Sequence, residues 1–119
     1  MTVPGRPGPV LEPVELDDTL GVPRELARSP DTFALRVRGE SMIGEQLRDG
    51  DLVLAQWSPA AREGDTVVAI VRDAAVVRRF HRQDGKVLLR SADEGLAPLV
   101  VDEEDVEVRG VVVAVVRKY

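Results

Sequence analysis

The sequence predicts a single domain that is all-β or nearly so, from its size, its valine content and the spacing of its apolar residues. The chain has 119 residues, of which 44% are hydrophobic, and this is enough to bury one ordinary globular core. The apolar residues are mostly valine and leucine, and valine favours a half-buried pleated surface over a helix. Short alternating runs bounded by turn residues recur along the chain, as the strands of a β-sheet do.

Proline dominates the first thirty residues, which we interpret as an extended arm (residues 1–30). Each proline fixes φ and removes a backbone donor, so a helix-turn-helix domain is not expected here. Short strands are expected at Val10-Leu11 and Val14-Glu15-Leu16, followed by one helical turn at 24–28. Six of the eight prolines lie in this stretch: Pro4, Pro7, Pro9, Pro13, Pro23 and Pro30.

The folded domain is expected to span residues 31–119 and to begin with a half-buried strand. Phe33, Leu35 and Val37 alternate with Arg36 and Arg38, which places the apolar side chains on one face and the arginines on the other. Similar runs predict further strands at 51–57, 66–72, 75–82, 86–91 and 106–117.

Tight turns are predicted between these strands. Asp84-Gly85 is a strong hairpin signal, because both central positions of such a turn need φ > 0. A second turn is expected at Asp73-Ala74. Asp49-Gly50-Asp51 is also interpreted as a turn, since two carboxylates alone do not make a metal site, and the acidic run at 102–105 as a solvated loop.

Composition excludes several classes of protein. The chain has no cysteine and a single histidine, His81, so we expect no disulfide, no metal site and no cofactor. The formal net charge is −5, which is not the footprint of a nucleic-acid binder. No apolar stretch approaches the roughly 20 residues that span a bilayer, and the N-terminus lacks a signal peptide. We therefore expect a soluble, cytoplasmic protein without a membrane partner.

Three motifs together resemble a known family. Gly39-Glu40-Ser41-Met42 is followed by Asp49-Gly50-Asp51 and later by Val76-Val77-Arg78-Arg79-Phe80, and this pattern resembles the self-cleaving domain of LexA-type repressors and UmuD over most of residues 10–119. The resemblance implies a compact fold of twisted antiparallel sheets with an extended N-terminal arm. It also implies a serine nucleophile at Ser41 and a buried lysine base at position 78.

Arginine occupies the position of that base. Ser41 and Arg78 are 37 positions apart (78 − 41), which matches the family's spacing, and strand parity puts Arg78 on the same face as Val76 and Phe80. A neutral lysine at pH 7 costs about 4.6 kcal/mol, whereas a neutral arginine costs roughly 8 kcal/mol or more. Arg78 is therefore not competent as a general base, and without one Ser41 stays a weak nucleophile.

The predicted cleavage site also departs from the family pattern. LexA-type domains cut their own arm at Ala-Gly, and this pair does not occur in the chain. The best registration puts Pro7-Gly8 there, and a shift of a few residues gives Val10-Leu11. Prolines beside the bond restrict the conformations that could place it over Ser41.

The valine-rich run 106–116 needs cover on both faces. The resemblance places this closing strand at a homodimer interface, with Val111, Val113 and Val115 as contact residues; the residues alone equally fit a central strand of the monomer's own sheet.

We therefore expect the C-terminal domain of a LexA-like transcriptional repressor of the SOS (DNA-damage) type, which acts as a dimerisation and regulatory module deficient in self-cleavage. The resemblance adds a RecA filament as a partner, and DNA would be bound only by a domain outside this chain. Two alternatives remain: an active serine autopeptidase that cuts near Pro7-Gly8 or Val10-Leu11, and a UmuD-like accessory subunit of a translesion polymerase.

Overall fold

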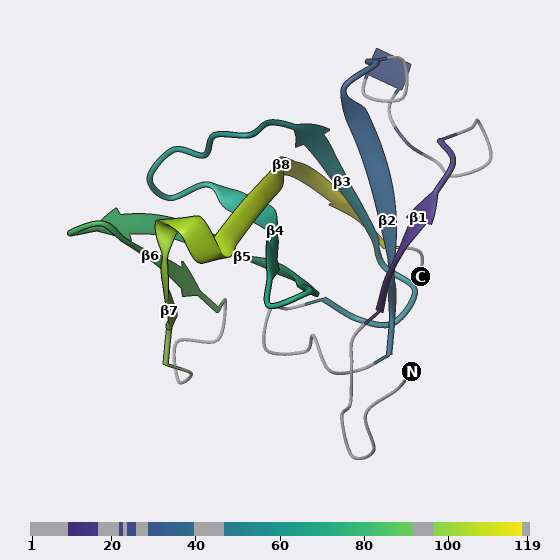
Figure 1. The fold of residues 1–119 in the computed structure, drawn as a ribbon. Coiled ribbons are helices and arrows are strands. Elements are labelled where there is room, and N and C mark those ends of the chain that lie inside the picture. The colour runs from purple at the N-terminus through teal and green to yellow at the C-terminus, as the bar shows by residue number, and fades with distance from the viewer. Residues whose placement is uncertain are drawn as a thin grey trace.

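The computed structural model describes residues 10–16, 22, 24–25, 29–39, 47–91 and 97–117. Within these residues eight strands form one antiparallel sheet, which confirms the predicted all-β class (Figure 1). The elements are β1 (Val10–Val14), β2 (Thr32–Arg38), β3 (Leu52–Trp57), β4 (Thr66–Val71), β5 (Ala74–Gln83), β6 (Lys86–Arg90), β7 (Leu99–Asp102), the 3-10 helix η3 (Glu103–Asp105) and β8 (Val106–Val116).

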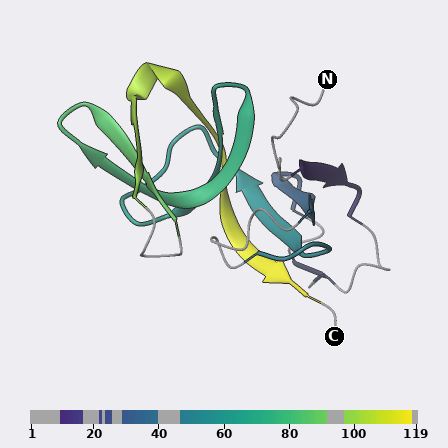
Figure 2. The same ribbon diagram turned by 90° about the horizontal axis from the view of Figure 1, so that it is seen from below.

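Strand β8 is central in the sheet, whose order is β1-β2-β3-β8-β4-β5-β6-β7. Its first part, Val106–Val111, pairs with β4, and its last part, Gly110–Val116, pairs with β3 on the other side. The sheet therefore has two halves that β8 joins, and Figure 2 shows β4 to β7 curling to one side of it. The reading of the valine run as a central strand is confirmed.

Two irregularities bend β8 between these halves. The pairing skips Arg109 opposite β4 and Val113 opposite β3, and such bulges increase local twist. Gly110 lies between them, where an added Cβ would stand 2.8 Å from the carbonyl oxygen of Gln56 and from two ring carbons of Phe33. Glycine is needed there because the Phe33 ring and the backbone of β3 approach so closely.

The core follows the predicted alternation. Phe33, Leu35 and Val37 of β2 pack in one cluster with residues of β3, β4 and β5. The opposite face of β2 is also partly covered, because Ala34 is buried in a second cluster with Leu52 and Leu54 of β3. A third cluster fills the half formed by β4 to β8.

The turns agree with the sequence prediction in one case and are shifted in the other. Asp84 and Gly85 have φ of 52° and 77°, as the hairpin requires. The turn between β4 and β5 lies at Arg72 and Asp73, with φ of 50° and 64°, one residue before the predicted Asp73-Ala74. The prediction was off because neither residue is a glycine, so nothing in the sequence marked the φ > 0 positions.

Strand β7 was not predicted, since it has four residues and lies next to an acidic run. Within that run Asp102 pairs with Lys86 and Glu103 with Arg82, so the carboxylates expected in a solvated loop also hold the end of β7 to its neighbours.

The arm is described only in part. Residues 10–14 form β1, an edge strand paired with β2, and an edge position tolerates Pro13 because it needs no ladder donor on its outer side. The rest of the predicted arm and helical turn falls mostly outside the described residues. In the part of the chain that is described, no helix is long and apolar enough to cross a membrane.

Candidate functional site

Arg78 occupies the middle of β5, directly opposite Val67 of β4. Its neighbours at i−2 and i+2, Val76 and Phe80, pack into the core cluster of this half, so strand parity turns Arg78 toward the same face. The side chain is half-buried, and its Nη1 donates to the carbonyl oxygen of Leu89 on β6 at 3.3 Å. A guanidinium on an apolar face needs oxygen acceptors, and the backbone of β6 supplies one.

Ser41 lies outside the described residues, as do Pro7 and Gly8. Both ends of the segment that contains Ser41 are described, however. At its start Gly39 donates its backbone N–H to Oδ1 of Asp49 at 2.8 Å. At its end Leu47 is buried in the core cluster with Val37.

The motif Asp49-Gly50-Asp51 forms the turn that the sequence predicts. Gly50 has φ of 91°, a conformation that glycine adopts without a steric penalty. The turn is fastened to β2, because Gly50 donates its N–H to the carbonyl oxygen of Val37 at 2.7 Å and Val37 donates to that of Asp51 at 2.9 Å. Arg36 adds a bond from its Nη1 to the Gly50 carbonyl oxygen at 3.0 Å.

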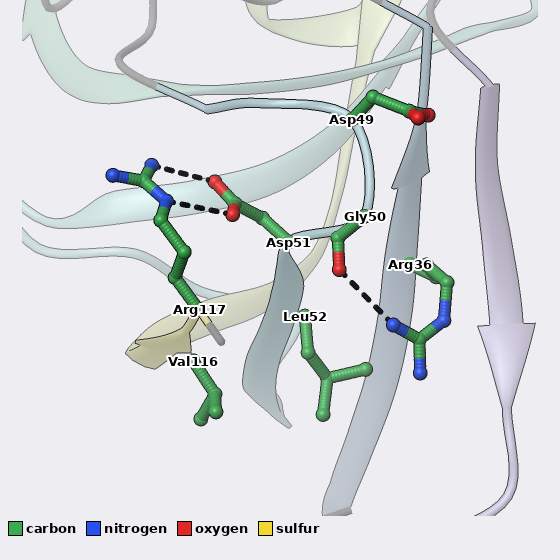
Figure 3. Close-up of a pocket in the computed structure, with 7 residues that line it drawn as sticks. All are labelled: Arg36, Asp49, Gly50, Asp51, Leu52, Val116 and Arg117. Atoms are coloured by element: carbon green, nitrogen blue, oxygen red, sulfur yellow. Dashed lines mark hydrogen bonds and ion pairs between the residues drawn. The ribbon is translucent and has the colours of Figure 1, made fainter. Parts of the chain in front are cut away.

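Asp51 is a buried carboxylate that is 2% exposed. Arg117, directly after β8, donates from Nε to Oδ1 at 2.8 Å and from Nη2 to Oδ2 at 2.7 Å (Figure 3). The backbone N–H of Arg48 also donates to Oδ2 at 2.8 Å. The hydrogen bonds from Arg117, against the opposing effect of burial and with help from the Arg48 N–H, hold the pKa of Asp51 below its usual value.

A cavity of about 320 Å³ opens beside this ion pair. Figure 3 shows Arg36 and Arg117 on opposite sides of the Gly50–Leu52 stretch, and each guanidinium donates to an oxygen of the turn. The cavity is lined by Arg36, Asp49, Gly50, Asp51, Leu52, Val116 and Arg117. Among these described residues, Asp51 and both arginines are engaged in bonds that hold the turn. Across the described part of the chain, no three His, Asp or Glu side chains are grouped to hold a metal ion.

Of the two residues in this ion pair, only Asp51 is marked by a local sequence pattern. An aspartate followed at once by Leu52-Val53-Leu54 begins a buried strand, which signals that its charge needs a partner. The partner stands 66 positions away, and no local pattern identifies it.

The three valines predicted for a dimer interface differ in their surroundings. Val111 is half-buried against the core cluster of its own sheet. Val113 and Val115 are 42% and 45% exposed, and the pairing of β8 with β4 ends at Val111. Among the described residues, the stretch 112–116 is therefore paired on one side only, with β3.

Val10 and Leu11, the second predicted cleavage region, belong to β1. They pair with Arg38 and Val37 of β2, and Leu11 packs against the core cluster. The bond between them thus lies inside a paired strand.

The curled all-β sheet, the turn at 48–51 and the position of Arg78 beside Val76 and Phe80 fit the class of domain that the sequence resembles. Residues 4–113 match the Peptidase S24-like family, and the chain belongs to it. It is similar to the LexA repressor of Syntrophotalea carbinolica, with 39% identity over 113 residues, which cover 94% of this chain and 56% of that protein.

The chain is also similar to two further LexA repressors. LexA repressor 1 of Nocardia farcinica is 39% identical over 110 residues (92% of this chain, 50% of that protein). The LexA repressor of Streptomyces coelicolor is 38% identical over 111 residues (93% and 47%). The chain spans about half the length of the curated relatives it matches.

Proposed function

We propose that this chain is the C-terminal domain of a LexA-like repressor, that it acts as a dimerisation and regulatory module, and that it is deficient in self-cleavage. Membership of the S24-like family and the similarity to LexA repressors support the first part. Arg78 supports the deficiency in self-cleavage, and the exposed valines of β8 support the dimer.

The environment of Arg78 is the main observation in support of a deficiency in self-cleavage. A serine peptidase of this kind needs a neutral amine that can take the serine proton. Guanidinium has five donors and no acceptor, and it stays protonated in proteins. The bond from Arg78 Nη1 to the Leu89 carbonyl oxygen uses the group as a donor, which supports a structural role in place of the base.

Mass spectrometry of the intact protein at alkaline pH tests this part of the proposal. The parent should keep its full mass. The variant Pro7→Ala/Arg78→Lys regains an Ala-Gly pair and a lysine, and we expect it to lose its arm at position 7, whereas the same variant carrying Ser41→Ala should stay intact. If the double variant also stays intact, Arg78 and the arm are not the cause of the deficiency.

The same experiment decides the first alternative. A parent that loses residues near Pro7-Gly8 or Val10-Leu11 while Ser41→Ala does not is an active autopeptidase. Cleavage at Val10-Leu11 would require β1 to leave its pairing with β2, which argues against that site.

We propose that two copies associate through β8. Val113 and Val115 are exposed on a stretch that has one free backbone edge among the described residues, and exposed apolar edges favour strand pairing. Sedimentation or light scattering should show a dimer that Val115→Asp weakens. Val100→Asp on β7, an equally exposed valine (52%), is the matched control and should not change the mass; equal effects of both changes would contradict this interface.

The wider role is part of the proposal and is supported only by the resemblance to LexA-type repressors. A LexA-like repressor of the DNA-damage response acts in the cytoplasm, binds DNA through its other domain and responds to a RecA filament. Incubating the parent with RecA on single-stranded DNA should leave its mass unchanged, since Arg78 removes the base. A direct complex of the chain with a translesion polymerase would favour the UmuD-like alternative.

A further inference from the structure

The ion pair between Asp51 and Arg117 is part of a larger bonded unit around the Ser41 segment. Asp51 receives three hydrogen bonds, two from Arg117 and one from the Arg48 N–H. Arg48 directly follows Leu47, the first described residue after that segment. The downstream end of the segment is therefore fixed to Asp51.

The upstream end is fixed by the other carboxylate of the same motif. Gly39 donates its N–H to Asp49 Oδ1 at 2.8 Å, and Gly50, between the two aspartates, is bonded to the Val37 carbonyl oxygen. Asp49 and Asp51 thus hold residues 39 and 48, the two flanks of residues 40–46. Figure 3 shows Asp49 directed away from the Asp51–Arg117 pair, so each carboxylate serves a different flank.

Arg117 connects this unit to the far end of the chain. It comes directly after β8, and its side chain is 30% exposed while that of Asp51 is 2% exposed. A buried carboxylate that loses its cation keeps most of its desolvation penalty. The Asp51 end of the turn is therefore less stable without Arg117, while the bonds to Val37 and from Arg36 still fasten Gly50 to β2.

We propose that the two carboxylates of this turn, together with Arg117, are positioning residues for the flanks of the segment 40–46. Asp49 fixes residue 39, and Asp51 with Arg117 fixes residue 48 relative to β8. The inference concerns where the segment is held and goes beyond the proposed function, since it stands whether or not Ser41 reacts. It would make Arg117, directly after β8, a determinant of how the flank at Leu47 and Arg48 is held.

Hydrogen–deuterium exchange on the full chain tests the proposal. In Arg117→Met, peptides covering residues 39–51 should exchange at least about tenfold faster than in the parent, because their local opening is no longer opposed by the ion pair. Peptides covering β5 and β6 should keep their rates. Arg117→Lys, which retains one charge but not the bidentate geometry, should give an intermediate rate in 39–51.

The control is Arg109→Met, which removes an exposed ion pair with Glu107 from the same strand and should change neither region. Digestion with a Glu-specific protease gives a second readout, since Glu40 and Glu45 lie in the segment: cleavage there should accelerate in Arg117→Met and remain at the parental rate in Arg109→Met. The proposal is overturned if 39–51 exchanges at the parental rate in Arg117→Met, or if all regions accelerate equally. If Arg117→Met does not fold, the same comparison is made with Arg117→Lys. An unchanged exchange rate of residues 39–51 in Arg117→Lys would then overturn the proposal.

Discussion

Replacing Gly110 by alanine tests the junction between the two halves of the sheet. The new Cβ would lie 2.8 Å from the carbonyl oxygen of Gln56 and from two ring carbons of Phe33, whereas carbon atoms normally approach to about 3.5–4.0 Å. The ring can tilt, but the Gln56 oxygen belongs to β3, which is paired with β8. Relief of the clash therefore disturbs backbone pairing.

The magnitude is a balance of two terms. Overpacking of this kind costs about 1–3 kcal/mol, and the backbone contact puts Gly110→Ala in the upper part of that range. Alanine in a strand otherwise stabilises by roughly 0.5–1 kcal/mol relative to glycine. We expect a net loss of about 1–2 kcal/mol in the free energy of unfolding, which lowers the melting temperature of a chain of this size by about 4–8 °C.

Thermal and urea unfolding, followed by circular dichroism, measure this loss. The ring and backbone parts of the clash separate in a Phe33→Leu background, where the cost of Gly110→Ala should fall by about 0.5 kcal/mol or more because the ring contacts are gone. A Gly110→Ala variant as stable as the parent would refute the reasoning, and so would a cost that Phe33→Leu leaves unchanged.

Two further changes have predictable signs. The pKa of Asp51 in the folded protein is below its ordinary value of 3.8. The ionised carboxylate therefore stabilises the fold above about pH 3.8, and this contribution is lost as the pH falls below that value. Asp51→Asn should be less stable than the parent at neutral pH, and the difference in unfolding free energy should shrink in urea melts below pH 3.8. Asp73→Gly changes the β4–β5 turn, where φ is 64°. It removes a left-handed strain of about 1–3 kcal/mol and adds a backbone entropy cost of about 0.5–1 kcal/mol, so the unfolding free energy should rise by about 0.5–2 kcal/mol; unchanged or lower stability would show that the turn is not strained.

The sequence predicted most of the strands because their signals are local. Alternation in 32–38 and the Asp84-Gly85 turn each depend on neighbouring residues, and the structure has them as β2 and as the β5–β6 hairpin. Parity assigns position 78 to the face of Val76 and Phe80, and the strand continues without a bulge between these two residues.

Features that depend on distant residues could not be predicted. The ion pair of Asp51 with Arg117 joins positions 66 apart, and the sequence contains many other arginines that fit the same charge. The small strand β7 contains two valines, which favour an extended backbone, but its four residues are too few to show a clear alternation, and its pairing with the edge of β6 could not be foreseen. Both are consequences of the assembled sheet.

Strand β8 explains why these distant features belong together. The first part of β8 pairs with β4, next to the strand that contains Arg78, and its last part pairs with β3, next to β2. Gly110 lies where these two parts meet. The residue after the strand, Arg117, then fixes the turn that follows the segment. Val113 and Val115 lie within four residues of Arg117. A partner that pairs with this edge of β8 would therefore contact the strand end that precedes Arg117. The proposed dimer contact and the proposed fixation of the flank at Arg48 would therefore share one short stretch of six residues, from Val112 to Arg117.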